Sequence, residues 1–178
     1  MRSPLSTQNQ FSEIVMKVIV KSLLPCSAEL VWNELQKSSL LIEVTWPIVV
    51  FTPISPKAIP LRWKQGTSVC IRCRLFGFFS ISPHVILFER IDHARKELQS
   101  RERDSMIRKW DHLVRVEVVD DNTALYTDEI EVNAGILTIP VALFVQCFYR
   151  YRQRRWLNVA GRLADNEAQP VMTAKRIA

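Results

Sequence analysis

Glycine is scarce in this chain, which has four glycines among 178 residues, and this argues against folds built on glycine-rich nucleotide-binding loops. The sequence contains no G-x-G-x-x-G, no P-loop and no G-x-S-x-G, the usual signatures of dinucleotide binding, phosphate binding and serine-hydrolase catalysis. It also lacks the H-E-x-x-H of zinc proteases. The chemistry of this protein must therefore come from residues that no short motif marks.

Cysteine is equally sparse, and its spacing does not favour a metal site. Cys70 and Cys73 form a C-x-x-C, but residues 67–76 (TSVCIRCRLF) predict a strand, in which positions three apart point to opposite faces. No second pair of ligands accompanies them, so we expect neither a metal nor a cofactor. Residues 1–12 lack the apolar core of a secretory signal, and we expect reduced thiols and a cytoplasmic protein.

The sequence has no long hydrophobic run either. Its most apolar stretch, IPVALFVQCFY at residues 139–149, supplies about a dozen residues, whereas a span needs roughly 20. A helix lying in the membrane interface, with its arginines at the lipid headgroups, stays open as an alternative.

The clearest pattern that is present is a long amphipathic helix over residues 135–164. Thr138 is placed to cap it, and Pro140 falls in its first turn, where a missing N–H costs little. A helix of roughly 25 residues is about 38 Å long, enough to lie across a whole sheet. The spacing of its apolar residues predicts one shared face made by Phe144, Phe148, Tyr151 and Arg155.

The residues before this helix read mostly as strands. Two short helices, at residues 28–36 and 39–42, follow the first strand, and prolines mark a loop at 53–60. We predict an α+β fold in which a curved antiparallel sheet of about seven strands wraps around the C-terminal helix. The expected boundaries are a disordered tail (1–14), one domain (15–164) and a flexible tail (165–178). The predicted strands cover residues 15–22, 43–52, 67–76, 79–90, 95–103, 107–119 and 123–132.

The last hairpin supports the most detailed inference. If its turn is centred on Asp121, Val114 pairs with Asp128 and His112 with Ile130, which places Asp128 diagonally across from His112 on one face. That face is predicted to point inward because the alternate positions are charged. Its members on the first strand of the hairpin are Trp110, His112, Val114, Val116 and Val118.

Two interpretations of this inner cluster remain open. His112, Tyr126 and Asp128 can simply satisfy one another as buried polar groups. Alternatively they line a pocket and orient a ligand, or His112 and Asp128 act as an acid/base pair. His84, which lies with Phe88 on another inward face, is a weaker candidate of the same kind.

The net charge of +6 is concentrated on the last helix, where Arg150, Arg152, Arg154 and Arg155 fall within six residues. They form either a solvated helix face or a surface for an anionic partner such as a membrane. Nucleic-acid binding is disfavoured because the exposed strand aromatics of single-strand RNA readers are not apparent.

Five segments matter together with this order of elements: SAELVW (27–32), LFGFF (75–79), WDH (110–112), YTDEI (126–130) and the arginines from position 150. With them the chain resembles the START/Bet v 1-like (SRPBCC) helix-grip superfamily, in particular its small bacterial polyketide cyclase/dehydrase-like or cell-division-inhibitor-like branch. The resemblance implies an apolar cavity between sheet and helix that holds a lipid, isoprenoid or polyketide-like ligand, and in a minority of members catalysis.

We therefore expect binding of a hydrophobic small molecule. A cyclase or dehydratase that uses His112 and Asp128 is the enzymatic alternative, and a peripheral membrane or adaptor protein that uses the four arginines is the third. The predicted ligand-binding residues are Trp110, His112, Val114, Tyr126, Asp128, His84 and Phe88 on the sheet, with Phe144, Phe148 and Tyr151 on the helix.

Overall fold

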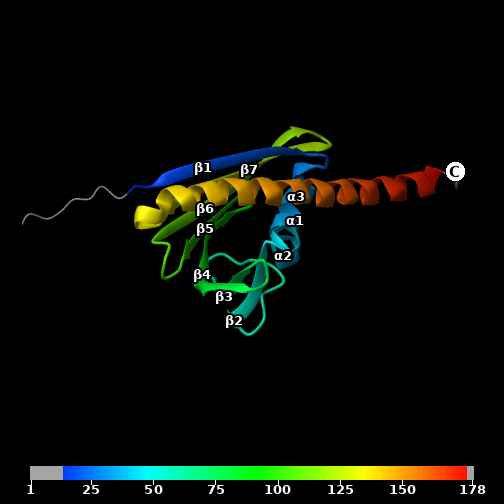
Figure 1. Ribbon diagram of the computed structural model, residues 1–178. Helices are drawn as coiled ribbons and strands as arrows, with labels where there is room; N and C mark the ends of the chain where they lie inside the picture. The colour runs from blue at the N-terminus through cyan, green and yellow to red at the C-terminus, as the bar shows by residue number, and fades with distance from the viewer. Residues whose placement is uncertain (1–13, 176–178) are drawn as a thin grey trace, which may run out of the picture.

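A computed structural model describes residues 14–175, in which seven strands form one antiparallel sheet. The sheet curls around the long helix, as Figure 1 shows, so the predicted helix-grip architecture is confirmed. The strand order is β1-β7-β6-β5-β4-β3-β2, which puts the first and last strands side by side. The strands are β1 (Met16–Leu24), β2 (Val49–Ser55), β3 (Ser68–Leu75), β4 (Phe79–Asp92), β5 (Glu97–Arg103), β6 (Lys109–Asp120) and β7 (Thr123–Asn133).

Two short helices follow β1, as predicted. In α1 (Ala28–Leu35) the Ser27 hydroxyl accepts a hydrogen bond from the backbone N–H of Leu30 at 3.4 Å, which is an N-cap. The second, α2 (Ser38–Thr45), extends beyond the expected turn at 39–42, so the first part of the segment predicted as extended (43–52) is helical. Strand β2 then runs on through Pro53, which fits its position at the edge of the sheet.

The C-terminal helix begins with a single turn, η1 (Gly135–Leu137), and continues as α3 (Thr138–Lys175). Thr138 does not act as an N-cap: its hydroxyl accepts from the N–H of Ala134 and donates to the carbonyl of Gly135, so it closes the preceding turn. The helix continues past residue 164, where we expected a flexible tail, and its end projects beyond the strands in Figure 1. Residues 1–13 and 176–178, which hold most of the first predicted tail and the end of the second, lie outside the described residues.

None of the helices within residues 14–175 combines the length and apolar content needed to cross a membrane.

The buried face of α3 differs from the predicted one by about one position. Phe148 is buried, but Tyr151 and Arg155 are half-buried and Phe144 is partly exposed. The inward positions include two polar residues: Arg152, which we expected on the surface with the other arginines, and Gln153. Six of the buried residues of α3 recur at steps of three and four: Ala142, Val145, Tyr149, Arg152, Trp156 and Ala160.

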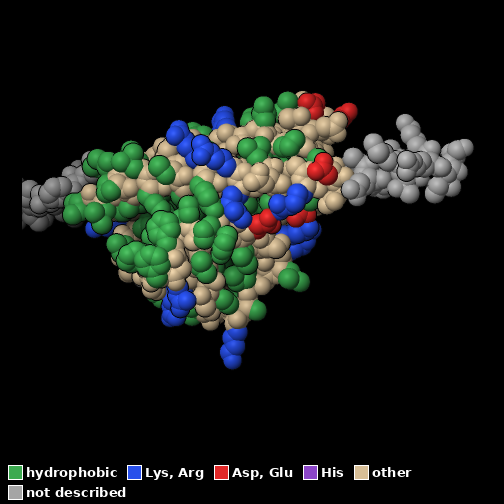
Figure 2. Space-filling view, turned by 45° about the vertical axis from the view of Figure 1, so that its right-hand side comes forward, with side chains coloured by type: hydrophobic (Ala, Val, Ile, Leu, Met, Phe, Trp, Pro, Cys, Tyr) green, Lys and Arg blue, Asp and Glu red, His purple; other side chains and the backbone are tan. Residues whose placement is uncertain are grey.

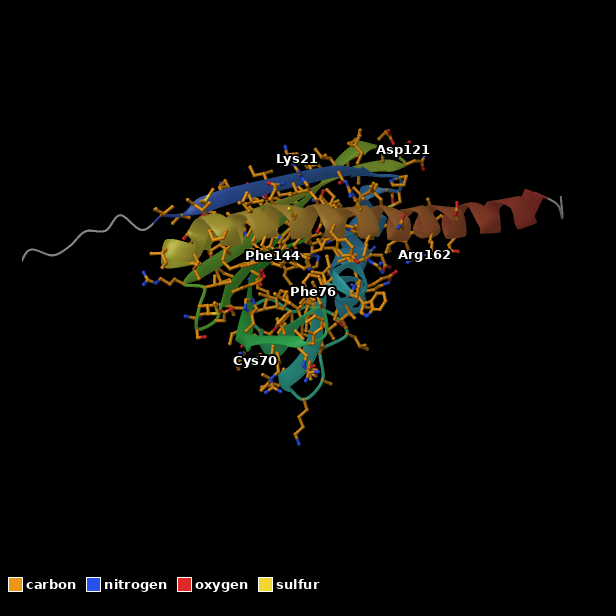
Figure 3. All side chains as sticks on the ribbon, in the orientation of Figure 1. Lys21, Cys70, Phe76, Asp121, Phe144 and Arg162 are labelled. Carbon is orange, nitrogen blue, oxygen red and sulfur yellow. The ribbon has the colours of Figure 1, made fainter. Side chains whose placement is uncertain are left out.

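The register of the β6–β7 hairpin is the predicted one. Val114 pairs with Asp128 and His112 with Ile130, and four of the five expected inward residues of β6 are buried. Val118 is the exception, since 69% of it is exposed. It lies beside a register shift at the hairpin end, and Figure 3 places Asp121 at that outer tip. The predicted alternation of inward and outward residues along β6 is correct, but the tip of the β6–β7 hairpin extends beyond the elements that would bury it.

Candidate ligand-binding cavity

A cavity of about 480 Å³ lies between the sheet, α2 and α3. Most of its wall is apolar, with residues from β2 to β7 on one side and from the two helices on the other. The aliphatic and aromatic part of the wall includes Leu40, Val44, Phe51, Trp63, Leu75, Ile86, Phe88, Leu98, Trp110, Val114, Phe144, Phe148 and Trp156.

The sheet residues that we predicted for the site all lie on this wall, as do Phe144 and Phe148. Tyr151 does not line the cavity, and its hydroxyl instead donates to the backbone carbonyl of Trp46. The role of the predicted site residues in ligand binding stays a prediction. The wall also contains residues that the sequence analysis did not select: Ser100, Glu102, Asp104, Tyr149, Arg152, Gln153 and Trp156.

Asp128 is the centre of the first polar cluster, and 1% of it is exposed. Its Oδ1 accepts from His112 Nε2 at 2.7 Å and from the Tyr126 hydroxyl at 3.1 Å, while Oδ2 accepts from Gln153 Nε2 at 2.9 Å. Burial by itself raises the pKa of this carboxyl, but the hydrogen bond and charge of His112, with the charge of Arg152, hold the pKa below its ordinary value. Asp128 is therefore an ionised carboxylate within the core.

Gln153 explains how the helix is held against this cluster. Its Nε2 donates to the Val20 carbonyl at 2.8 Å as well as to Asp128, and its Oε1 accepts from the Ser22 hydroxyl at 2.7 Å. One buried amide thus connects α3 to β1 and to β7. It could not be selected from the sequence because its partners come from segments more than a hundred residues away on β1 and 25 residues away on β7.

A second polar cluster surrounds His84. Its Nε2 lies 2.9 Å from Glu102 Oε2 and its Nδ1 lies 3.3 Å from Asp104 Oδ2, while Ser100 donates to the other Glu102 oxygen at 2.8 Å. Burial opposes protonation of His84, but the two carboxylates outweigh burial and raise its pKa; the pKa of Glu102 is lowered in return, against its own burial. Glu102 also lies 4.0 Å from His112 Nδ1, so the two clusters meet on the wall.

The alternation of β5 contained a signal for this second cluster. Leu98, Ser100 and Glu102 share one face of the strand, and Leu98 and Ser100 are buried. The polar composition of residues 95–103 (RKELQSRER) is typical of a strand with a solvated face. The burial of Glu102 depends on its partner His84, which lies on the neighbouring strand β4.

The arginines of α3 are divided between the interior and the surface. Arg152 is buried, with its guanidinium carbon 4.5 Å from the ring centre of Tyr149. Arg155 is half-buried and donates from Nε to the Glu43 carbonyl at 3.1 Å, whereas Arg150 and Arg154 are exposed. The predicted anionic-partner surface of four arginines is therefore wrong for Arg152.

The cavity reaches the surface near the start of α3. Three of its lining residues are themselves partly exposed: Met106 by 60%, Leu137 by 44% and Phe144 by 37%. Phe76, Phe78 and Phe79, at the β3–β4 hairpin, are exposed and do not line the cavity. Figure 2 shows hydrophobic side chains gathered on the surface beneath the long helix. A ligand would enter between α3 and the connection from β5 to β6.

Neither protein-family models nor curated proteins gave a match to this chain. Solved structures, in contrast, gave matches to this chain. Norcoclaurine synthase from Thalictrum flavum superposes with a TM-score of 0.63 at 8% identity, covering 89% of this chain and 99% of that one. The Zhui aromatase/cyclase from Streptomyces sp. R1128 superposes with a TM-score of 0.57 at 15% identity, covering 87% of this chain and 96% of that one. A START superfamily protein from Mycobacterium smegmatis superposes with a TM-score of 0.60 at 9% identity, covering 83% of this chain and 98% of that one.

At such low identity these likenesses show the fold alone. The chain has the helix-grip fold of the Bet v 1 and START proteins, which confirms the fold that the resemblance implied. The narrower assignment to a cyclase-like or cell-division-inhibitor-like branch stays a prediction.

Proposed function

We propose that this protein binds a hydrophobic small molecule, of lipid, isoprenoid or polyketide-like character, in the cavity between the sheet and α3. The observation that supports this most strongly is the cavity itself, because about 480 Å³ falls within the range of roughly 300–1,000 Å³ typical of ligand sites. Its wall is mainly apolar with a few convergent polar groups, which is the usual composition of such sites.

Native mass spectrometry of the freshly purified protein, followed by solvent extraction, tests this directly. We expect a stoichiometric apolar adduct, or, if the protein is purified empty, saturable uptake of a fluorescent apolar probe. A protein that carries no adduct and takes up no apolar probe would contradict the proposal.

A matched pair of tryptophan substitutions locates the binding. Val141 lines the cavity on the first turns of α3, whereas Leu143, two residues further on, is exposed and does not line it. Val141→Trp places bulk at the cavity wall, so we expect it to reduce probe binding, while Leu143→Trp leaves binding unchanged. Equal effects of the two substitutions would mean that the probe binds elsewhere.

Acid/base catalysis on the bound molecule is a second candidate, because a carboxylate–imidazole pair faces the cavity. Since Nε2 of His112 donates to Asp128, its Nδ1 is the acceptor in the neutral ring; it lies 3.4 Å from the Tyr149 hydroxyl. An imidazole held in this way can take a proton at Nδ1 from a ligand or through Tyr149. Once the ligand is known, His112→Gln distinguishes the two functions: catalysis predicts lost turnover with retained binding. If wild-type protein leaves the extracted ligand unchanged, the catalytic candidate is excluded for that compound.

A further inference from the structure

Arg152 carries a buried positive charge that the protein itself leaves without a close acceptor. The residue is 9% exposed, and its guanidinium packs over the ring of Tyr149 at 4.5 Å and more distantly over Phe148 at 5.9 Å. Its buried Nε has no hydrogen-bond partner, and within residues 14–175 no carboxylate oxygen lies within the 4.0 Å of an ion pair with it. A buried charge without a partner is costly, which points to an acceptor supplied from outside the chain.

The acids on the cavity wall cannot easily supply that acceptor, since each is already engaged by other donors. Asp128 accepts from three side chains, and Glu102 accepts from His84 and Ser100. Asp104 accepts from the backbone N–H groups of Met106 and Ile107 at 2.7 and 2.8 Å and contacts His84. Arg152, which is itself part of the cavity wall, therefore keeps its donors for a ligand, and it is the charged one among the described wall residues with an unpartnered buried donor, the others being the indole N–H groups of Trp110 and Trp156.

The chemistry of the guanidinium defines what would bind there. Its planar fork of N–H donors matches the two oxygens of a carboxylate, and it is less strongly hydrated than an ammonium group, which suits it to a buried ion pair. The rest of the cavity wall is mostly apolar. We infer that Arg152 binds the carboxylate of an apolar acid whose hydrocarbon body fills the cavity. This inference rests on the proposed function and specifies its ligand class.

The test compares two probes that share one body, cis-parinaric acid and its methyl ester, in fluorescence titrations. Charge-assisted hydrogen bonds predict that wild-type protein prefers the acid by about tenfold or more. Arg152→Gln should remove this preference by weakening binding of the acid and not of the ester. Arg154→Gln is the matched control, because it removes the same charge from an exposed position two residues away and should keep the preference. Thermal unfolding confirms that each variant is folded.

The outcomes separate this inference from the proposed function. If neither probe binds wild-type protein, the proposed function itself fails for this class of molecule, and the inference fails with it. If both bind equally well, or if folded Arg152→Gln still prefers the acid, the cavity binds apolar molecules but Arg152 is not the carboxylate site. Should Arg152→Gln not fold, Arg152→Lys keeps the charge without the fork: we expect acid binding to weaken several-fold and ester binding to be unchanged. Unchanged acid binding in that variant would overturn the inference.

Discussion

Replacing Asp128 by Asn tests whether the buried polar cluster holds the helix on the sheet. The substitution preserves the shape of the side chain but replaces one carboxylate oxygen by an NH₂ group. Oδ1 can still accept from His112 and Tyr126, but the new NH₂ faces Gln153 Nε2, which is also a donor. Turning the Gln153 amide over relieves this contact only by creating another, because its oxygen would then face the Val20 carbonyl.

The expected cost combines two effects. One hydrogen bond to a charged group is lost at a buried position, and His112 Nε2, at 2.7 Å, loses its charged acceptor. Leaving a buried group without its hydrogen-bond partner costs about 1–3 kcal/mol, and a hydrogen bond to a charged group contributes about 1.5–3 kcal/mol. Because Asn keeps two of the three hydrogen bonds, we expect a loss of about 2–4 kcal/mol in the free energy of unfolding.

Glu129→Gln is the control, since Glu129 is the next residue on β7 and points to the opposite face. It pairs with Lys17 at 2.6 Å and with Arg115 at 3.1 Å, both of which are partly solvated. Partly exposed pairs of this kind contribute less than about 1 kcal/mol. Urea unfolding of the two variants measures the difference, with the denaturant slope compared to confirm that the change is one of stability. The reasoning is refuted if Asp128→Asn costs no more than Glu129→Gln.

Two further predictions concern the same network. Because Glu102 and Asp104 raise the pKa of His84 above 6.5 despite its burial, the stability that this protonation contributes is complete below pH 6.5 and is lost as the pH rises through the folded-state value. Unfolding measured at stepped pH should show this loss in wild-type protein and not in His84→Gln; the same slope in both would assign it to other groups. Gln153→Leu should cost about 2 kcal/mol or more in urea unfolding, because the Val20 carbonyl and the Ser22 hydroxyl lose their partner inside the protein. The half-buried Gln146, on the same helix, provides the comparison: Gln146→Leu should change stability by under about 1 kcal/mol, and an equal cost at both positions would contradict the assigned role of Gln153.

Strand alternation and one turn were enough to predict the His112–Asp128 contact from the sequence. The period of two assigns each residue of a strand to a face, and the turn centred on Asp121 sets which residues pair. The order of elements could also be predicted, because short capped helices, alternating strands and one long amphipathic helix have different local sequence patterns. These features depend on neighbours a few residues away, and that is why the sequence alone determined them.

The tertiary structure decided which side of α3 faces the sheet and what the cavity contains. Gln153 points inward because Asp128, Val20 and Ser22 supply hydrogen-bond partners from strands far away in the chain. For Arg152 the same strands supply no close acceptor, only the more distant negative charge of Asp128. Glu102 faces the cavity for the same reason, since His84 reaches it from the next strand. The helical period places residues on one side of α3 relative to each other, but the orientation of a polar side chain depends on partners that only the folded chain brings within reach.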